Sequence, residues 1–380
     1  MKILCIIGTR PEAIKMAGLI ILMKQDKRFE CIVCATSQHK ELLHDALRFF
    51  GITVEYDLSI MQPKQQLFEI TVNILKTIEA VILSENPDII LVQGDTTTTF
   101  ISALAGFYSK IRIGHVEAGL RTFDKNAPYP EEMNRQMISR IADLHFAPTQ
   151  GAKQNLLQEN IPENKIHITG NTVIDSLFLV ISKIKSIADP ESSGLFPSIS
   201  SDVWKHLNDN SKKIILVTAH RRENHANNLG IVCQALNELA KRDDVIIIFS
   251  VHPNPNVKEY VEIELRNTRN ILLLKPLDYM SFVFLMNKSY LIITDSGGIQ
   301  EEAPSLGKPV LLTRDLTERP ESVVAGTVTI VGCNSERIVS KAVSLLENQD
   351  EYTKMAQINS LYGDGKSSER ILEILANQLS

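Results

Sequence analysis

The 380-residue sequence is 44% hydrophobic and 22% charged, values typical of a folded protein, and it is long enough for two domains with separate cores. Its net charge of -5 and the lack of a Lys/Arg block argue against nucleic acid as a partner. No apolar run approaches the roughly 18 residues of a membrane-spanning helix, so we expect no membrane partner either.

The first predicted element is a buried strand at residues 3–7 that ends at Gly8. The apolar stretch of "MKILCIIGTR" is too short for a signal peptide, so we expect a cytoplasmic protein. The C-x-x-C pattern of Cys31 and Cys34 falls within a strand-like run, where positions three apart face opposite sides. We therefore interpret both as buried structural thiols rather than a redox or zinc pair.

Short β-rich runs alternate with helical stretches in two successive series. Near-continuous Val, Ile and Leu runs are typical of strands buried on both faces of a parallel sheet. The predicted strands are 3–7, 31–36, 88–93, 112–116, 144–148 and 165–169, and then 213–218, 245–251, 270–274, 291–294, 309–313 and 328–331. The polar region 187–213 lies between the series, so we predict an α/β protein with two Rossmann-like domains facing a cleft.

Ligands bind beyond the carboxyl ends of strands in such sheets, so the residues there are the candidates for function. In "GTRPEAIKM", after the first strand, Arg10 and Lys15 lie near a helix start, where anions bind. A solvated basic pair on a surface helix is an equally good interpretation of these two residues.

Three acids follow predicted strands or open a helix in the first series. Asp95 follows 88–93, Glu117 follows 112–116, and Glu131 follows Pro130 at a helix start. A helix cap for Asp95, or a dipole contact and an Arg135 pair for Glu131, would explain either acid alone. Three acids at one sheet edge favour acid-base chemistry instead.

In the second series, several predicted strands are followed by patterns typical of phosphate binding. "TAHRREN" places His220 beside two arginines, whereas His252, before a Pro-rich turn, favours a structural role. In "DSGGIQEE", Gly297 and Gly298 let the backbone approach a phosphate at a helix start. Glu302, one turn on, suits ribose hydroxyls, so the inferred ligand is a nucleoside diphosphate with an attached group.

Together these stretches resemble the bacterial non-hydrolysing UDP-N-acetylglucosamine 2-epimerases. The matching pieces span Gly8 to Ile371 and include "GTRPEAIKM", "QGDTTTTF", "GHVEAGLRT", "PYPEEMNRQ", "ITGNTVID", "VTAHRREN", "DSGGIQEEAPSLGKPV", "TERPE" and "YGDGKSSERI". The resemblance implies the two-domain fold shared with many sugar-nucleotide glycosyltransferases (GT-B type), with a last helix that returns to the first domain. The implied domains are 1–170 plus 367–380, and 171–366.

The resemblance implies reversible conversion of UDP-GlcNAc to UDP-ManNAc, by loss and re-addition of UDP through 2-acetamidoglucal, for surface polysaccharide synthesis. It implies no cofactor and no metal, a UDP-sugar as the small-molecule partner, and a homodimer. The implied catalytic residues are Asp95, Glu117, Glu131 and His220. The implied substrate contacts are Arg10, Lys15, Leu277, Phe282, Ser296, Gly297, Gly298, Glu302 and Arg319.

Some members of the resembled family bind a second UDP-GlcNAc as an activator. Gln38, Gln65 and His252 match the positions of that effector site. Glu41 and Lys64 depart from the pattern, and Lys64 lacks the bidentate geometry of arginine. We therefore expect an effector site that is weakened or absent.

Three other functions remain compatible with the motifs. A UDP-sugar glycosyltransferase has the same fold, although it needs fewer acids. A hydrolysing epimerase would release free ManNAc and UDP. A UDP-sugar-binding regulator would need the nucleotide site but not the three acids.

Overall fold

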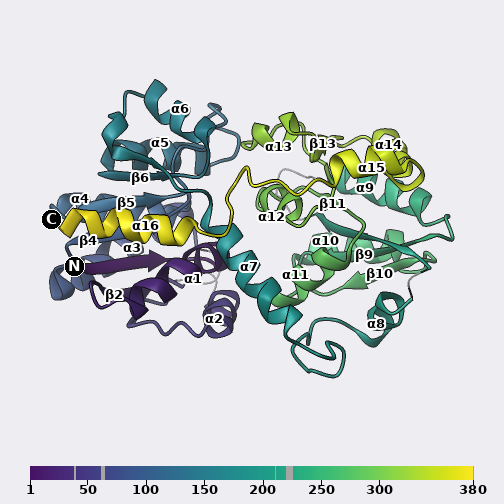
Figure 1. Ribbon diagram of the computed structural model, residues 1–380, viewed down its shortest axis with the longest axis horizontal. Coiled ribbons are helices and arrows are strands. Elements are labelled where there is room, and N and C mark those ends of the chain that lie inside the picture. The colour runs from purple at the N-terminus through teal and green to yellow at the C-terminus, as the bar shows by residue number, and fades with distance from the viewer. Residues whose placement is uncertain (38–39, 61–64, 210, 220–225, 380) are drawn as a thin grey trace. The chain divides into compact units, whose positions relative to one another are not determined.

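The computed structural model describes residues 1–37, 40–60, 65–209, 211–219 and 226–379. The chain forms two compact units, residues 1–179 with 362–380 and residues 180–361 (Figure 1). The domain boundaries predicted after residues 170 and 366 stay a prediction. In the described residues, no helix has the length and apolar character needed to cross a bilayer.

The first unit is built on a seven-stranded parallel sheet with the order β3-β2-β1-β4-β5-β6-β7. Its strands are β1 (Lys2–Ile7), β2 (Glu30–Ala35), β3 (Tyr56–Asp57), β4 (Ile89–Gln93), β5 (Arg112–Val116), β6 (Leu144–Ala147) and β7 (Ile166–Ile168). The helices are α1 (Arg10–Gln25), α2 (Lys40–Phe49), α3 (Leu67–Glu85), α4 (Thr97–Tyr108), α5 (Glu131–Ile141), α6 (Gln150–Gln158), the start of α7 (Thr172–Lys185) and α16 (Ser367–Ala376), with short 3-10 turns at Glu163–Lys165 and Asn377–Leu379.

The second unit holds a six-stranded parallel sheet with the order β10-β9-β8-β11-β12-β13. Its strands are β8 (Lys213–Ala219), β9 (Val245–Val251), β10 (Ile271–Leu274), β11 (Leu291–Thr294), β12 (Val310–Leu312) and β13 (Val328–Ile330). Its helices are α8 (Ser201–Leu207), α9 (Ala226–Leu239), α10 (Pro255–Leu265), α11 (Tyr279–Lys288), α12 (Ile299–Ser305), α13 (Pro320–Val324), α14 (Ser335–Glu347) and α15 (Gln349–Met355).

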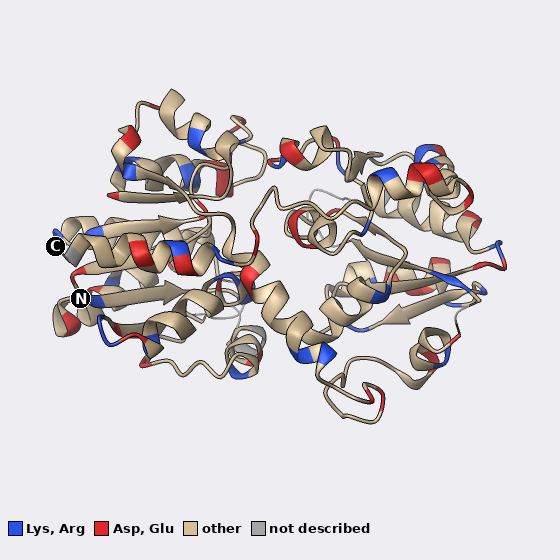
Figure 2. Ribbon diagram, in the orientation of Figure 1, with Lys and Arg blue, Asp and Glu red and all other residues tan. Residues whose placement is uncertain are grey.

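The predicted class, two α/β domains with parallel sheets, is confirmed. All twelve predicted runs are strands, and the sequence reasoning missed only the two-residue β3. Charged residues within the strands stand only at a first or last position, as at Lys2, Glu30, Asp57, Arg112 and Lys213 (Figure 2). The strand interiors therefore lie between helices, where an unpaired charge would be costly.

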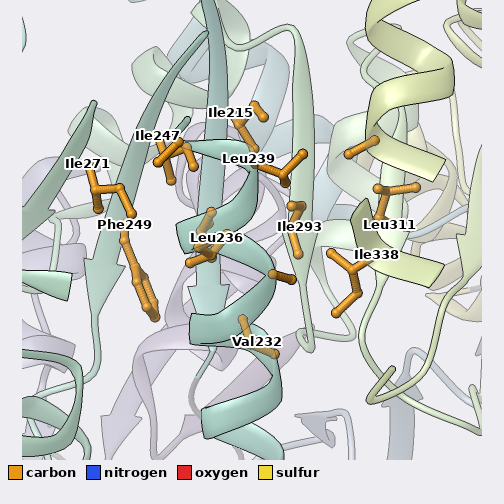
Figure 3. Packing of buried hydrophobic residues seen from close by; sticks show 14 of the residues in the cluster. Ile215, Val232, Leu236, Leu239, Ile247, Phe249, Ile271, Ile293, Leu311 and Ile338 are labelled. Carbon is orange, nitrogen blue, oxygen red and sulfur yellow. The ribbon is translucent and has the colours of Figure 1, made fainter. Parts of the chain in front are cut away.

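The core of the second unit shows how the helices cover such a sheet. Val232, Leu236 and Leu239 of α9 point toward strand residues such as Ile215 and Ile247 (Figure 3). These side chains are 0–2% exposed. Each buried side chain of this size stabilises the fold by about 1.5–3 kcal/mol, so packing rather than helix propensity holds α9 in place.

The C-terminal helix α16 packs on α1 of the first unit, as predicted. The amides of Ser367 and Ser368 donate to the carboxylate of Asp175 at 3.2 and 2.7 Å. The Ser368 hydroxyl would lie 3.0 Å from a Cβ at Gly18 in α1, which shows how closely the two helices approach. The chain therefore leaves the second unit and completes the first.

Candidate active site

The loop after β1 is tied to the loop after β4 by a buried acid, Glu12. Its carboxylate accepts hydrogen bonds from the Thr9, Thr96 and Thr99 hydroxyls at 2.7, 2.9 and 3.1 Å, and from the Gly8 amide at 3.2 Å. Burial raises the pKa of Glu12, while these donors favour its charged form. Glu12 is therefore a structural link between two loops.

Gly8 is required by a close approach rather than by its backbone angles. A Cβ at this position would lie 2.3 Å from the Thr98 Oγ1 and 2.8 Å from the Thr36 Oγ1. Helix α1 then begins at Arg10, with Thr9 as its N-cap and Pro11 in its first turn. Arg10 and Lys15 lie on α1 as expected, one near its start and one a turn further on.

Asp95 follows β4 and is held by the side chain of Arg135. The Arg135 Nε and Nη2 donate to the Asp95 Oδ2 at 2.9 and 2.5 Å, and the Asn134 amide donates to the Asp95 carbonyl at 2.8 Å. The helix cap that would have explained Asp95 is made by Thr96 instead, which accepts from the Thr99 amide. The hydrogen bonds from Arg135 and Asn134 thus join Asp95 to α5.

Glu117 follows β5, which neighbours β4 in the sheet. Its Oε2 accepts hydrogen bonds from the Lys15 Nζ at 2.5 Å and from the Asn171 Nδ2 at 2.8 Å, and its side chain is 4% exposed. The backbone at Glu117 has φ +67°, a left-handed conformation that L-residues other than Asn and Asp seldom adopt. The strained backbone, together with these two donors, fixes where this carboxylate lies.

Glu131 begins α5, directly after Pro130, as predicted. Its neighbour Glu132 is fully buried and accepts from the Thr122 and Phe123 amides at 3.0 and 3.2 Å and from the Arg135 Nη1 at 3.2 Å. Glu132 therefore anchors the preceding loop and orients Arg135. Glu131, by contrast, is half-buried.

Sequence reasoning missed the groups that orient the acids. The sequence predicts Arg135 only as a partner of Glu131, whereas in the structure it donates to Asp95. Asn171 stands out in the sequence only as part of "ITGNTVID", whereas in the structure it donates to Glu117. The contacts join residues 40, 54 and 102 positions apart, so no local pattern reveals them. The one signal is that Asn171 and Arg135 both stand near strand or helix ends at the same edge of the sheet.

In the second unit, the turn between β11 and α12 contains Ser296, Gly297 and Gly298. A Cβ at Gly297 would lie 2.7 Å from the Arg319 Nη1 and 3.0 Å from the Glu318 Oε1, so the protein itself requires glycine there. A Cβ at Gly298 would meet only the Glu302 Oε1, at an ordinary 3.6 Å. Packing within the described chain therefore leaves room for a side chain at Gly298.

Arg319 supports this turn from a buried position. Its Nη1 donates to the Glu318 Oε1 at 2.6 Å, and its Nε donates to Glu301. All three side chains are at most 5% exposed. Arg314 also donates to Glu318, at 3.2 Å, so both arginines belong to one network.

Glu302 lies in α12 one turn beyond the glycines, and Tyr279 orients it. The Tyr279 hydroxyl donates to the Glu302 Oε2 at 2.7 Å. Burial and the nearby carboxylate raise the pKa of Tyr279 well above its ordinary value, so the phenol stays a donor. Leu277 is buried and Phe282 half-buried around the start of α11, where Tyr279 also lies.

Several predicted positions lie outside the described residues. His220, with Arg221 and Arg222, belongs to this group, as do Gln38 and Lys64 of the effector site. The side chain of Glu41 is not described either. Of the other effector positions, Gln65 precedes α3, and the His252 Nδ1 accepts from the Asn254 amide at 3.2 Å, which suits a structural role.

The cysteines show a contact that the sequence did not predict. The Cys31 Sγ lies 3.9 Å from the Cys5 Sγ on the neighbouring strand, and Cys34 is buried. All five cysteines are free thiols. Within the described ranges, no three His, Cys, Asp or Glu side chains gather in a way that would hold a metal ion.

The chain matches the family model described as UDP-N-acetylglucosamine 2-epimerase over residues 22–376. It is 51% identical to the UDP-N-acetylglucosamine 2-epimerase of Yersinia pestis, over 99% of both chains. Its fold matches the Neisseria meningitidis UDP-GlcNAc 2-epimerase bound to UDP-GlcNAc, with TM-score 0.92 and 46% identity over 99% of this chain and 100% of that one.

A glycosyltransferase of Rickettsia africae is also similar in structure, with TM-score 0.63 and 18% identity over 100% of this chain and 98% of that one. At that identity the likeness concerns the GT-B fold alone. The family match and the 51% identity over nearly the whole chain establish the family as well as the fold. The chain therefore belongs to the UDP-N-acetylglucosamine 2-epimerase family, whose members are isomerases.

Proposed function

We propose that this protein interconverts UDP-GlcNAc and UDP-ManNAc by inverting C2 of the sugar without hydrolysing it. The observation that carries the proposal is the pair of oriented carboxylates on neighbouring strands, Asp95 held by Arg135 and Glu117 held by Lys15 and Asn171. Glu131, at the start of α5, is the third acid of the set.

The chemistry explains why several acids are needed. The C2 proton of the sugar is not next to a carbonyl, so simple proton removal is too difficult. In the proposed reaction a carboxylate takes this proton while the bond from C1 to the UDP oxygen breaks and its electron pair leaves with UDP. A C1–C2 double bond forms, giving 2-acetamidoglucal. UDP then adds back to C1 as a second group protonates the other face of C2.

The nucleotide is proposed to bind at the turn after β11. The Gln300 and Glu301 amides at the start of α12 already donate to the Gly297 and Gly298 carbonyls, so the diphosphate is proposed to lie against the turn itself, where Gly298 leaves room for it. Glu302, oriented by Tyr279, would accept from the ribose hydroxyls, and Leu277 and Phe282 would flank the uracil. Arg319 and Ser296 would shape the turn, and Arg10, Lys15 and His220 are proposed substrate contacts.

An NMR time course in deuterated water, with UDP-GlcNAc and no acceptor, tests this function. UDP-ManNAc carrying deuterium at C2 is the expected product. Product without deuterium would exclude proton exchange at C2, and free ManNAc as the main product would show a hydrolysing enzyme. No reaction without an acceptor would favour a glycosyltransferase.

We also propose that two copies of the chain associate through helix α3. Phe68, Val72 and Leu83 lie along one side of α3 and are 84%, 46% and 71% exposed. Phe107 and Tyr108, at the end of the adjacent α4, are 58% and 66% exposed. Exposed apolar side chains on two adjacent helices favour an interface at this part of the surface.

Sedimentation of the Phe68→Glu variant tests this interface. We expect the wild type to sediment as a dimer and the variant as a monomer. Ile263→Glu, which changes an exposed apolar residue of α10 in the second unit, is the matched control and should remain dimeric. A monomeric wild type, or a dimeric Phe68→Glu, would contradict the proposal.

We further propose that the reaction takes place in the cytoplasm and supplies ManNAc units for surface polysaccharides. Five free thiols support a reducing compartment. Fractionation of cells that make the protein, followed with an antibody, would locate it. Recovery in an extracellular fraction of intact cells would contradict this location.

A further inference from the structure

A cavity of about 300 Å³ lies at the amino-terminal edge of the second sheet. Its wall includes Lys213, Tyr290 and Lys308, which stand at or just before the starts of β8, β11 and β12. These three strands are neighbours and run parallel. The turn at Ser296 follows the other end of β11, so the cavity is separate from the candidate nucleotide turn.

The wall of this cavity carries a strong excess of positive charge. Lys212, Lys213, Lys288 and Lys308 line it, whereas Asp209 is its one carboxylate among the described residues. In the part of the chain that the structure describes, none of the four lysines forms an ion pair with an acid. Surface lysines elsewhere in this unit, such as Lys241 and Lys258, do have acidic partners.

The hydrogen-bond acceptors of two of these lysines are neutral. The Lys212 Nζ donates to the Asn270 Oδ1 at 2.7 Å, and the Lys213 Nζ donates to the Leu346 carbonyl at 2.6 Å. Lys213 also lies 4.4 Å from the centre of the Tyr290 ring, a favourable contact for a cation. Both ammonium groups are therefore held by neutral acceptors, and the nearby carboxylates Asp209 and Asp244 act on Lys212 and Lys213 only from a distance.

The other two lysines oppose each other electrostatically. Lys308 is half-buried, and burial, followed by the charge of Lys288, lowers its pKa. A bound anion would remove both penalties at once, because it would compensate the buried charge and screen the repulsion between the two ammonium groups. Without an anion, the burial of one ammonium group and its repulsion by the other therefore lower the free energy of unfolding.

The tyrosines of the wall restrict what the ligand can be. Tyr290 and Tyr352 stack with ring centres 3.9 Å apart, and their hydroxyls donate to the Leu345 and Tyr290 carbonyls at 3.1 Å. Their hydroxyls are therefore already used, and recognition rests on the lysines. Lysine binds phosphate as a point charge and tolerates varied geometry.

We propose that this lysine cavity, defined by Lys212, Lys213, Lys288 and Lys308, binds a small anion with several phosphate charges. The site is independent of the proposed reaction. A diphosphate is the simplest member of this class, and a cavity of about 300 Å³ is at the lower end of the usual size for small-molecule sites.

Calorimetric titration of the full-length protein with inorganic diphosphate tests the proposal. The wild type should show a binding component that is at least tenfold weaker in the Lys288→Met, Lys308→Met double variant. The Lys241→Met, Lys258→Met double variant removes the same charge from the same unit and should bind as the wild type does. Diphosphate held elsewhere in the protein would contribute equally to all three proteins.

Indistinguishable isotherms for the wild type and the Lys288, Lys308 variant would overturn the proposal, as would an equal loss in the control variant. Thermal unfolding gives a second measurement, in which diphosphate should raise the melting temperature of the wild type more than that of the Lys288, Lys308 variant. Epimerisation by this variant without diphosphate should equal that of the wild type, and a loss would contradict a separate site.

Discussion

At the carboxyl edge of the first sheet, two of the acids of the proposed function, Asp95 and Glu117, are each held by a cation from a distant part of the chain. Lys15 and Glu117 are 102 positions apart, and Arg135 and Asp95 are 40 apart. After β11 of the second sheet, the charged groups instead lie beneath a glycine turn, where Arg319 joins Glu301 and Glu318.

This difference separates two ways of using buried charge. In the proposed function, the side chains of the first unit take part in the chemistry, so their positions must be set by partners. In the second unit, the buried network shapes the backbone of the turn that is proposed to bind the nucleotide. Substitutions in the first unit should therefore affect turnover, whereas those in the second should affect folding and nucleotide affinity.

The largest expected effect tests the chemical role of the first edge. Asp95→Asn and Glu117→Gln should each lower kcat by about 100- to 10,000-fold, the usual contribution of an acid-base group. The dissociation constant for UDP should stay unchanged, because UDP is proposed to bind in the second unit. Steady-state kinetics and calorimetry measure the two quantities.

Glu163→Gln is the control for these variants, because Glu163 is an exposed acid of the same unit whose side chain is 72% accessible. It should leave kcat unchanged. A wild-type kcat in both Asp95→Asn and Glu117→Gln would show that these acids take no part in the reaction.

The second prediction concerns the buried network beneath the glycine turn. Arg319→Met leaves Glu301 and Glu318 buried without their shared cation and should destabilise the protein by about 3–5 kcal/mol, the scale for breaking a buried ion pair. Urea unfolding measures this change. Arg314→Met, which removes one contact to Glu318 from the rim of the network, should cost less, and an equal cost would contradict the distinction.

The third prediction is that the stability of the two units depends differently on pH. Burial lowers the pKa of His115 to about 4 and that of His145 to about 3 in the first sheet. Because the unfolded state binds these protons more readily, stability is complete above pH 6.5 and is lost as the pH falls toward those values. At pH 5 each histidine should cost about 2 kcal/mol relative to neutral pH.

Glu12 and Asp175 oppose this trend, because burial raises their pKa and the native state then gains protons as the pH falls. The two histidines nevertheless lie in the first unit. When the pH is lowered from 7.5 to 5, hydrogen exchange should show a larger loss of protection in the first unit than in the second. His145→Phe should reduce that loss, and an unchanged pH slope in this variant would contradict the assignment.

The smallest expected effects concern UDP affinity at the turn after β11. Glu302→Gln should weaken UDP binding by about 1–3 kcal/mol, because it spoils a charged hydrogen bond. Tyr279→Phe removes only the donor that orients Glu302 and should cost about 0.5–1.5 kcal/mol. Calorimetry with UDP ranks the two variants, and unchanged affinity in a folded Glu302→Gln would refute the ribose contact.

Much of the fold could be predicted because its signals are local. The apolar runs that became β1 and β9, for example, are continuous and too short for helices, and buried parallel strands need that composition. The two-residue β3 could not be found, since Tyr56 and Asp57 carry no periodicity. The return of α16 followed from family resemblance, not from residue spacing.

The candidate site divides in the same way between sequence and structure. The strands, the acids and glycines at their ends, and the family resemblance could all be predicted from the residues, because each depends on neighbours in the chain. The contacts of Asn171 with Glu117 and of Arg135 with Asp95, and the position of Arg319 beside Gly297, could be seen only in the folded chain. Parallel strands bring the ends of distant strands to one edge of the sheet, and a charge buried there is stable only with a partner.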